Sequence, residues 1–157
     1  MSIPLPGKKP KTILIVGATG AQGMAVATAL LRPSPESDTP SPYHVRALTR
    51  DPTSRRAKEL EAMGAELFQG CFYDVNAAKQ FMSGCYGAFI NTDTYTVGEE
   101  REIWAATKLY EFARRTPSMS HWIWSNLDYG SKVRSDQPFF FFSSFLFLLI
   151  ILMLIPG

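Results

Sequence analysis

Cysteine, histidine and net charge are all low in this sequence. Its 157 residues include two cysteines and two histidines, and the formal net charge is +2 at pH 7. So small a charge gives no reason to expect binding to nucleic acid or to a membrane surface through bulk electrostatics. Residues 1–11 contain prolines and lysines but lack the apolar stretch of a secretory signal peptide. We therefore expect a cytoplasmic protein with reduced cysteines, and we predict no metal site.

The sequence does contain a glycine-rich turn between two regular elements. Residues 12–16 are apolar and mostly β-branched, which is typical of a strand that is buried on both faces. Gly17, Gly20 and Gly23 follow at intervals of three, and small residues and leucines then continue with helical character to Leu31. The order of strand, glycine turn and helix is that of the dinucleotide-binding fingerprint.

Each of the three glycines has its own expected function. Gly17 lets the chain turn sharply out of the strand, Gly20 lets the backbone approach a pyrophosphate, and Gly23 lets the helix pack closely on the strand. The start of the helix adds unpaired N–H groups and the positive end of a dipole. The alternative is a tight turn that packs a helix on a strand without any ligand.

Strands and helices alternate along the rest of the chain, which has enough residues, 46% of them hydrophobic, for one domain with a core. An insertion with four prolines, residues 32–42, follows the first helix. Further strands are expected at 44–49, 65–68, 86–91 and 121–124, and further helices at 52–63, 75–82 and 99–115. The alternation predicts an α/β fold, a doubly wound parallel sheet of Rossmann type with strand order 3-2-1-4-5.

In such a sheet, a ligand binds at the carboxyl ends of the strands. Five segments are expected at that edge: residues 17–22, 50, 69–73, 91–94 and 125. His44 and His121 begin strands and therefore lie at the other edge, where we interpret them as ordinary surface or strand residues. Cys71 and Cys85 are expected at opposite edges, which makes a disulfide between them improbable.

The end of the second strand indicates which dinucleotide is preferred. Arg50 stands where a NADP site places a cation for the 2′-phosphate and a NAD site places an acid for the ribose. Thr53 and Ser54 follow at a helix start, where backbone N–H groups are free. Asp51 is suited to a ribose, but a helix-capping function accounts for it without a ligand. We predict NADP in preference to NAD, and leave open whether three further cations contact it or only face solvent: Arg55, Arg56 and Lys58.

The catalytic pair of short-chain dehydrogenases is missing. In these enzymes a lysine follows the catalytic tyrosine at i+4, on the same face of a helix. None of the six tyrosines has a lysine at that spacing. Tyr129 has Lys132 three residues later, but the glycine and serine between them favour a loop. Ser125 is a weak candidate for contacting a substrate or a nicotinamide, and a buried serine bonded to backbone is the more common outcome. Whether the chain is an enzyme is left open.

Several motifs together resemble the NmrA-like family of atypical short-chain dehydrogenases. They are the stretches at 16–23, 49–52, 64–66, 69–70 and 125–128, within a similarity that covers roughly residues 11–133. The resemblance implies a Rossmann-type domain that binds NAD(P). It often acts as a redox-sensing regulator of transcription factors or other protein partners, in the cytoplasm or the nucleus, and sometimes as a reductase related to isoflavone reductases. In such proteins the tyrosine–lysine pair is commonly lost.

The resemblance also implies which residues contact the dinucleotide. The pyrophosphate would lie on Gly17, Ala18, Thr19, Gly20, Ala21, Gln22 and Gly23; the adenosine phosphate on Arg50, Asp51, Thr53 and Ser54; the adenine beside Cys71 and Phe72; and the nicotinamide side near Thr92, Asp93 and Thr94. Cys71 replaces an aspartate that is usual in the family. Family members are also about twice as long, with a small substrate-binding lobe after the matching region.

The end of the chain is different in character. We divide the sequence into an N-terminal tail (1–11), the Rossmann domain (12–135) and an apolar tail (136–157). Residues 139–155 are all apolar except Ser143 and Ser144. As a helix they would span about 25 Å, and with Lys132 and Arg134 before them would make a tail anchor in a membrane. The favoured alternative is translated non-coding sequence in place of the second half of the protein. The product would then be truncated and non-functional, with an unpaired fifth strand and poor solubility.

Overall fold

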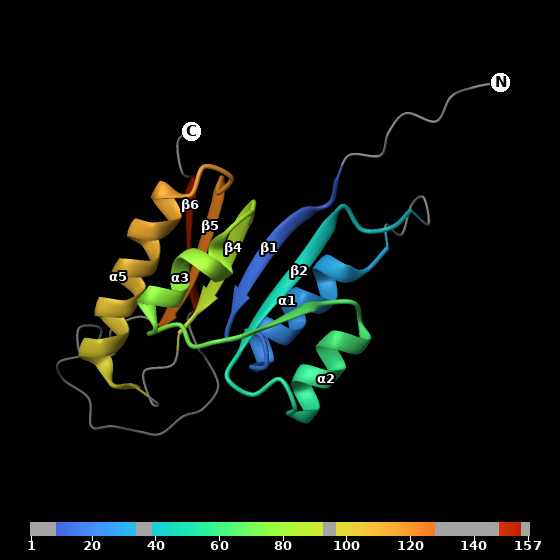
Figure 1. Cartoon of the computed structure of the whole chain (residues 1–157), viewed down its shortest axis with the longest axis horizontal. Helices are drawn as coiled ribbons and strands as arrows, with labels where there is room; N and C mark the ends of the chain where they lie inside the picture. The colour runs from blue at the N-terminus through green and yellow to red at the C-terminus, as the bar shows by residue number, and fades with distance from the viewer. Residues whose placement is uncertain (1–8, 34–38, 93–96, 128–147, 155–157) are drawn as a thin grey trace.

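The protein is built on one sheet with strand order β3-β2-β1-β4-β5-β6 (Figure 1). A computed structural model describes residues 9–33, 39–92, 97–127 and 148–154. The strands are β1 (Lys11–Val16), β2 (Tyr43–Thr49), β3 (Glu66–Gln69), β4 (Gly87–Asn91), β5 (His121–Leu127) and β6 (Leu148–Leu154). The helices are α1 (Ala21–Leu31), α2 (Arg55–Ala62), α3 (Val75–Met82) and α5 (Glu99–Arg115). The first five strands are parallel, which confirms the predicted doubly wound sheet of Rossmann type with order 3-2-1-4-5.

The apolar tail contributes the sixth strand. β6 pairs antiparallel with β5 along its whole length, from Leu148 opposite Leu127 to Leu154 opposite His121. The prediction of an unpaired edge beside β5 is therefore wrong, and this part of the tail is not the helix that a tail anchor requires. A run of leucine and isoleucine suits a helix or a strand, and here it satisfies the backbone groups at the edge of β5. In the described part of the chain, no helix has the length and apolar character needed to cross a membrane.

Several element boundaries differ from the sequence-based expectation, most by one residue and three in ways that affect the site. Helix α2 begins at Arg55 rather than at residue 52, because Ser54 is its N-cap and accepts a hydrogen bond from the Ala57 N–H (3.4 Å). The predicted capping function of Asp51 is therefore wrong, and its carboxylate instead bonds to Thr53 within the preceding turn. Helix α1 begins at residue 21 rather than 24. Strand β5 continues past residue 124, so Ser125 lies inside the strand and not after it.

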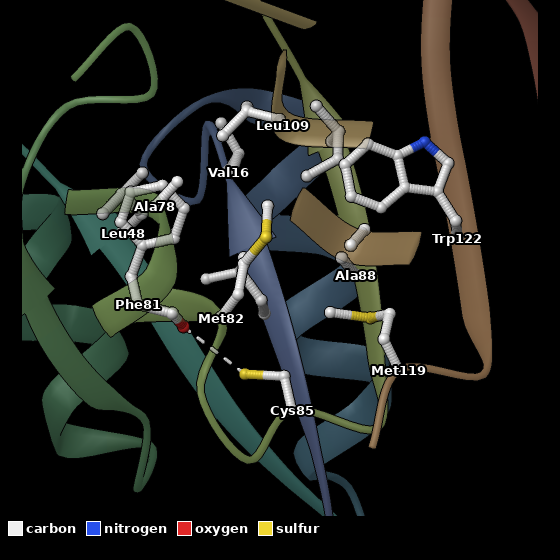
Figure 2. Packing of buried hydrophobic residues seen from close by; sticks show 13 residues of the cluster. Val16, Leu48, Ala78, Phe81, Met82, Cys85, Ala88, Leu109, Met119 and Trp122 are labelled. Atoms are coloured by element: carbon white, nitrogen blue, oxygen red, sulfur yellow. Dashed lines mark hydrogen bonds between the residues drawn. The ribbon is translucent and has the colours of Figure 1, made fainter. Parts of the chain in front are cut away.

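Helices pack on both faces of the sheet and make two cores. On one face, Phe81 and Met82 of α3 and Leu109 of α5 pack against the sheet beside Trp122 of β5 (Figure 2). On the other face, side chains of α1 and α2 cover β1 and β2, and Leu60 of α2 is fully buried in that cluster. This double coverage explains the apolar sequence of β1, since neither face of a central parallel strand meets water.

A mostly buried cation ties α3 to the sheet. Arg46 of β2 donates through Nε to Glu66 of β3 (3.0 Å) and through Nη1 to the carbonyl oxygens of Phe81 (3.1 Å) and Ser83 (2.9 Å). These carbonyls belong to the last turn of α3 and the residue that caps it, where the helix itself provides no donors. The guanidinium therefore links β2, β3 and α3 at one point.

Both cysteines are free. Cys71 follows β3 at the carboxyl edge of the sheet, whereas Cys85 is buried just before β4 at the other edge, which confirms that they form no disulfide. The Cys85 thiol donates to the carbonyl of Phe81 (3.4 Å), drawn as the dashed line in Figure 2. Burial raises the pKa of this thiol.

Candidate functional site

A cavity of about 380 Å³ lies at the carboxyl ends of four parallel strands. It is lined by the glycine loop after β1, the end of β2, the segment after β3 and the end of β4, namely Val16, Gly17, Thr19, Gly20, Leu48, Thr49, Arg50, Gly70, Cys71, Phe72, Asn91 and Thr92. The structure therefore brings together four of the five segments expected at this edge. Their contacts with a dinucleotide stay a prediction.

The glycines of the loop differ in backbone conformation and in the space around them. Gly17 has a φ of +75°, and a Cβ there would lie 2.5 Å from the carbonyl oxygen of Asn91. A Cβ on Gly23 would lie 2.3 Å from the carbonyl oxygen of Gly17, so both positions require glycine for the fold itself. Gly20 has an ordinary φ of −76°, and its Cβ would meet only the Gly17 oxygen, at 3.2 Å. The missing side chain at Gly20 leaves backbone open toward the cavity.

The start of α1 offers N–H groups without a capping side chain. Gly20 is the N-cap, and no described side chain hydrogen-bonds there. The Gly20 N–H donates to the carbonyl of Gly17 (2.9 Å), and the Met24 N–H makes the first helical bond, to Gly20 (3.0 Å). The N–H groups of the first turn and the positive end of the helix dipole are thus placed beside the cavity, which suits an anion.

The end of β2 presents an arginine. Arg50 is exposed at the cavity and makes no ion pair or hydrogen bond with other residues that the structure describes. The Asp51 carboxylate accepts from the N–H (2.8 Å) and the hydroxyl (2.6 Å) of Thr53, and these bonds lower the pKa of Asp51. The hydroxyls of Thr49 and Ser54 both donate to the Asp51 carbonyl (3.1 and 3.0 Å). The turn therefore uses Asp51 in its own hydrogen bonds, whereas the Arg50 guanidinium takes no part in them.

The three further cations on α2 differ in their contacts. Arg55 pairs with Glu59 (3.2 Å) and Lys58 pairs with Glu61 (2.8 Å), as expected of a solvated helix face. Arg56 instead donates through Nη1 to the carbonyl of Thr19 in the glycine loop (2.8 Å). This contact joins residues 37 apart in the sequence, and no sequence pattern indicated it.

The segment after β3 forms the wall opposite the glycine loop. The Gly70 N–H donates to the carbonyl of Thr49 (2.9 Å), which holds this segment beside β2. Cys71 and Phe72 are half-buried and face the cavity. The rings of Phe72 and Tyr73 pack edge to face at 5.5 Å, and a hydrogen bond with Cys71 raises the pKa of Tyr73.

The remaining candidates lie around β4 and β5. Ser125 is buried, with 4% of its surface exposed, and its hydroxyl donates to the amide oxygen of Gln22 on α1 (2.6 Å). Sequence reasoning placed both residues at this edge but did not predict their contact. The Thr92 hydroxyl bonds to the carboxylate of Glu102 on α5. Four predicted site residues lie outside the described part of the chain: Asp93, Thr94, Tyr129 and Lys132. Among the described residues, no group of three His, Cys, Asp or Glu side chains is suited to a metal ion.

Comparison with known proteins identifies the family. The sequence profile of the NmrA-like family matches residues 9–141. The NmrA-like family domain-containing oxidoreductase notA of Aspergillus sp. (strain MF297-2) is 42% identical over 84 residues, which is 54% of this chain and 23% of that protein. The chain thus spans less than a quarter of the length of that curated relative.

Solved structures agree with the sequence comparison. NmrA, a negative transcriptional regulator, in complex with NAD superposes with a TM-score of 0.67 at 28% identity, covering 82% of this chain and 37% of NmrA. The complex of NmrA with NADP gives a TM-score of 0.66 at 28% identity and the same coverage. The resemblance inferred from the motifs is confirmed, and the chain belongs to the NmrA-like family.

Proposed function

We propose that the carboxyl-edge cavity binds a nicotinamide adenine dinucleotide. The observation that carries this proposal is the uncapped start of α1, which opens into the same cavity as the Arg50 guanidinium. Pyrophosphate bears negative charge that such N–H groups bind, and the bare backbone at Gly20 lets it come close. The names of the NmrA structures, in complex with NAD and with NADP, support a dinucleotide as the ligand. When bound, the nicotinamide ring supplies hydride-transfer chemistry.

The preferred dinucleotide in this proposal is NADP. Arg50 is exposed at the end of β2, and Asp51 beside it is already bound by Thr53. A guanidinium grips a phosphate through paired N–H groups, and the hydroxyls of Thr53 and Ser54 lie in the same turn. Adenine would lie against Cys71 and Phe72. The nicotinamide side would extend toward residues 92–94.

For the use of the bound dinucleotide, the leading proposal is redox sensing. The protein would bind oxidised and reduced cofactor with different affinity and thereby change its affinity for a protein partner, such as a transcription factor. The name of NmrA as a negative transcriptional regulator supports this role. So does the hydrogen bond of the Ser125 hydroxyl to Gln22, because a substrate would have to compete with Gln22 for that proton.

A second proposal is a NADPH-dependent reductase of a small metabolite, similar to isoflavone reductases. The names of the curated relatives favour it, since notA and its homologue himF of Aspergillus japonicus are both called oxidoreductases. Ser125, Tyr129 and Lys132 are then the candidates for contact with the substrate. Turnover separates the two proposals: sustained oxidation of NADPH in the presence of enones supports the reductase, and binding without turnover supports the sensor.

Binding itself is tested by calorimetry on this chain with NADP⁺, NADPH and NAD⁺. We expect NADP⁺ to bind more tightly than NAD⁺, and Arg50→Glu to reverse that order. Arg114→Glu is the matched control, because Arg114 is exposed in the last turn of α5, at the opposite edge of the sheet. Absence of heat with every dinucleotide would contradict the proposed function. An unchanged preference in Arg50→Glu would remove only the assignment of Arg50.

A further inference from the structure

The contact between Arg56 and the glycine loop fixes one peptide unit at both ends. Arg56 donates to the carbonyl of Thr19 (2.8 Å), and the N–H of the same peptide unit, which belongs to Gly20, donates to the carbonyl of Gly17 (2.9 Å). Arg56 belongs to the first turn of α2, whereas the loop precedes α1. One exposed side chain of α2 therefore holds this peptide unit of the loop together with a bond inside the loop.

This orientation matters for an anionic ligand. Carbonyl oxygens repel phosphate oxygens, and N–H groups attract them. Here the carbonyls of Gly17 and Thr19 both face donors within the protein, so their negative ends are already occupied. No described side chain caps the N–H groups at the start of α1, which lie beside the cavity. A loop held in this form needs no rearrangement when a pyrophosphate enters, which favours affinity.

We propose that Arg56 is a positioning residue for the pyrophosphate, acting through the Thr19 carbonyl rather than by touching the ligand. This inference rests on the proposed function. It differs from the assignment of Arg50, whose guanidinium contacts the adenosine phosphate directly. It also differs from a purely structural role, because it predicts an effect only on ligands that contain a pyrophosphate.

The chain offers a matched control one residue away. Arg55 lies on the same helix, has the same charge and is exposed like Arg56, but it pairs with Glu59 (3.2 Å) instead of with the glycine loop. Loss of this surface pair has little effect on stability. Arg55→Gln therefore removes one positive charge from α2 without changing the glycine loop.

The experiment measures the affinity of three ligands for the native sequence and for Arg56→Gln, Arg56→Lys and Arg55→Gln. NADP⁺ contains both the pyrophosphate and the 2′-phosphate, ADP-ribose contains only the pyrophosphate, and 2′-AMP contains only the 2′-phosphate. Calorimetry serves for the first two, and NMR titration for the weak binding of 2′-AMP. We expect Arg56→Gln to weaken NADP⁺ and ADP-ribose by roughly tenfold and to leave 2′-AMP unchanged. Arg56→Lys should recover part of the loss, and Arg55→Gln should stay within about twofold of the native affinity.

Each other outcome overturns the inference in a recognisable way. Unchanged affinity of Arg56→Gln for ADP-ribose shows that the contact does not position the loop. A loss for NADP⁺ and 2′-AMP without a loss for ADP-ribose shows that Arg56 touches the 2′-phosphate itself. A loss for all three ligands together with a melting temperature below that of Arg55→Gln shows a structural role. If the native sequence binds none of the three ligands, the proposed function fails as well.

Discussion

The three glycines at positions 17, 20 and 23 have different functions, although they are the same residue type. Gly17 and Gly23 allow the chain to fold, since a Cβ on either would overlap backbone atoms at 2.5 and 2.3 Å. Gly20 would meet only one oxygen, at 3.2 Å, so the fold tolerates a methyl group there with a small adjustment. A glycine that the fold does not require, next to a cavity, indicates that its missing side chain makes room for a ligand.

Alanine substitutions test this division. We expect Gly17→Ala and Gly23→Ala each to lower the free energy of unfolding by about 2–4 kcal/mol, because each forces backbone atoms apart. Gly20→Ala should cost less than about 1 kcal/mol but weaken NADP⁺ binding at least tenfold, since the methyl group occupies the path of the pyrophosphate. Urea unfolding and calorimetry measure the two effects. Equal losses of stability in all three variants would contradict the division.

The two thiols differ in their access to reagents. Cys71 is half-buried in the cavity wall, whereas Cys85 is buried and its pKa is raised by burial. Because the thiolate is the reactive form, iodoacetamide should modify Cys71 in the native protein and Cys85 only after unfolding. Bound NADP⁺ should slow modification of Cys71 if adenine lies beside it. Mass spectrometry of the alkylated peptides gives both rates, and rapid labelling of Cys85 in the folded protein would contradict its burial.

The raised pKa of Cys85 also predicts a pH dependence of stability. The folded state favours the neutral thiol, so the unfolded chain releases this proton first as pH rises. The contribution of Cys85 to the free energy of unfolding is thus fully present below the ordinary thiol pKa and is lost as pH rises toward the raised value. Urea unfolding at pH 7 and at about pH 10 should show a larger alkaline loss for the native sequence than for Cys85→Ala. Equal losses would contradict the prediction.

At the scale of elements, three polar contacts join helices and strands whose relative positions the hydrophobic cores alone do not fix. Arg46 links β2 to β3 and to the end of α3, Arg56 links α2 to the glycine loop, and Ser125 links β5 to the first turn of α1. Apolar packing is non-directional, whereas each of these bonds fixes one element against another within a few tenths of an ångström. The second contact reaches the glycine loop and the third reaches the first turn of the helix that follows the loop, so both act near the start of α1.

Replacing Arg46 tests the first of these links. The Arg46 side chain is only 17% exposed, and Arg46→Met removes the guanidinium donor from the Ser83 and Phe81 carbonyls and from the Glu66 carboxylate. The Phe81 carbonyl keeps only its hydrogen bond from the Cys85 thiol (3.4 Å). We expect the free energy of unfolding to fall by about 2 kcal/mol. Arg55→Met, which breaks an exposed pair, should lower it by less than about 0.5 kcal/mol. Urea denaturation measures both. A change in Arg46→Met no larger than that in Arg55→Met would show that the hydrogen bonds of Arg46 contribute nothing to the free energy of unfolding.

At the scale of the whole molecule, local patterns predicted the order of the strands, because alternation and the handedness of crossovers leave few topologies. Helix α5 was predicted at its observed bounds, because the acids at its start, the arginines at its end and its apolar face all indicate the same helix. The choice between Asp51 and Ser54 as N-cap was not predictable, because both side chains suit that position and the bonds to Thr53 decide it. Contacts between residues 37 and 103 apart, Arg56 with Thr19 and Ser125 with Gln22, follow from tertiary packing and leave no local pattern.

The apolar tail is the part of the sequence with the least informative pattern and the largest effect on the sheet. Its apolar residues do not recur at the spacing of a helix or alternate as in a half-buried strand, so the sequence alone does not predict β6. The strand forms because the edge of β5 provides a partner for its backbone groups. The same edge would otherwise be open to a second molecule.

Shortening the chain tests whether β6 protects that edge. Removal of residues 148–157 takes away every β6 partner of the β5 residues from His121 to Leu127 and leaves the pairing of β5 with β4, whereas removal of 155–157 alone leaves both sets of partners. We expect the first variant to form dimers or larger aggregates, because the backbone groups of β5 then pair between molecules, and the second to behave as the native sequence does. Size-exclusion chromatography with light scattering measures the mass of each. If the shorter variant has the same mass as the native protein at equal concentration, the β5–β6 pairing does not protect the edge, and the tail is dispensable for the sheet that carries the cavity.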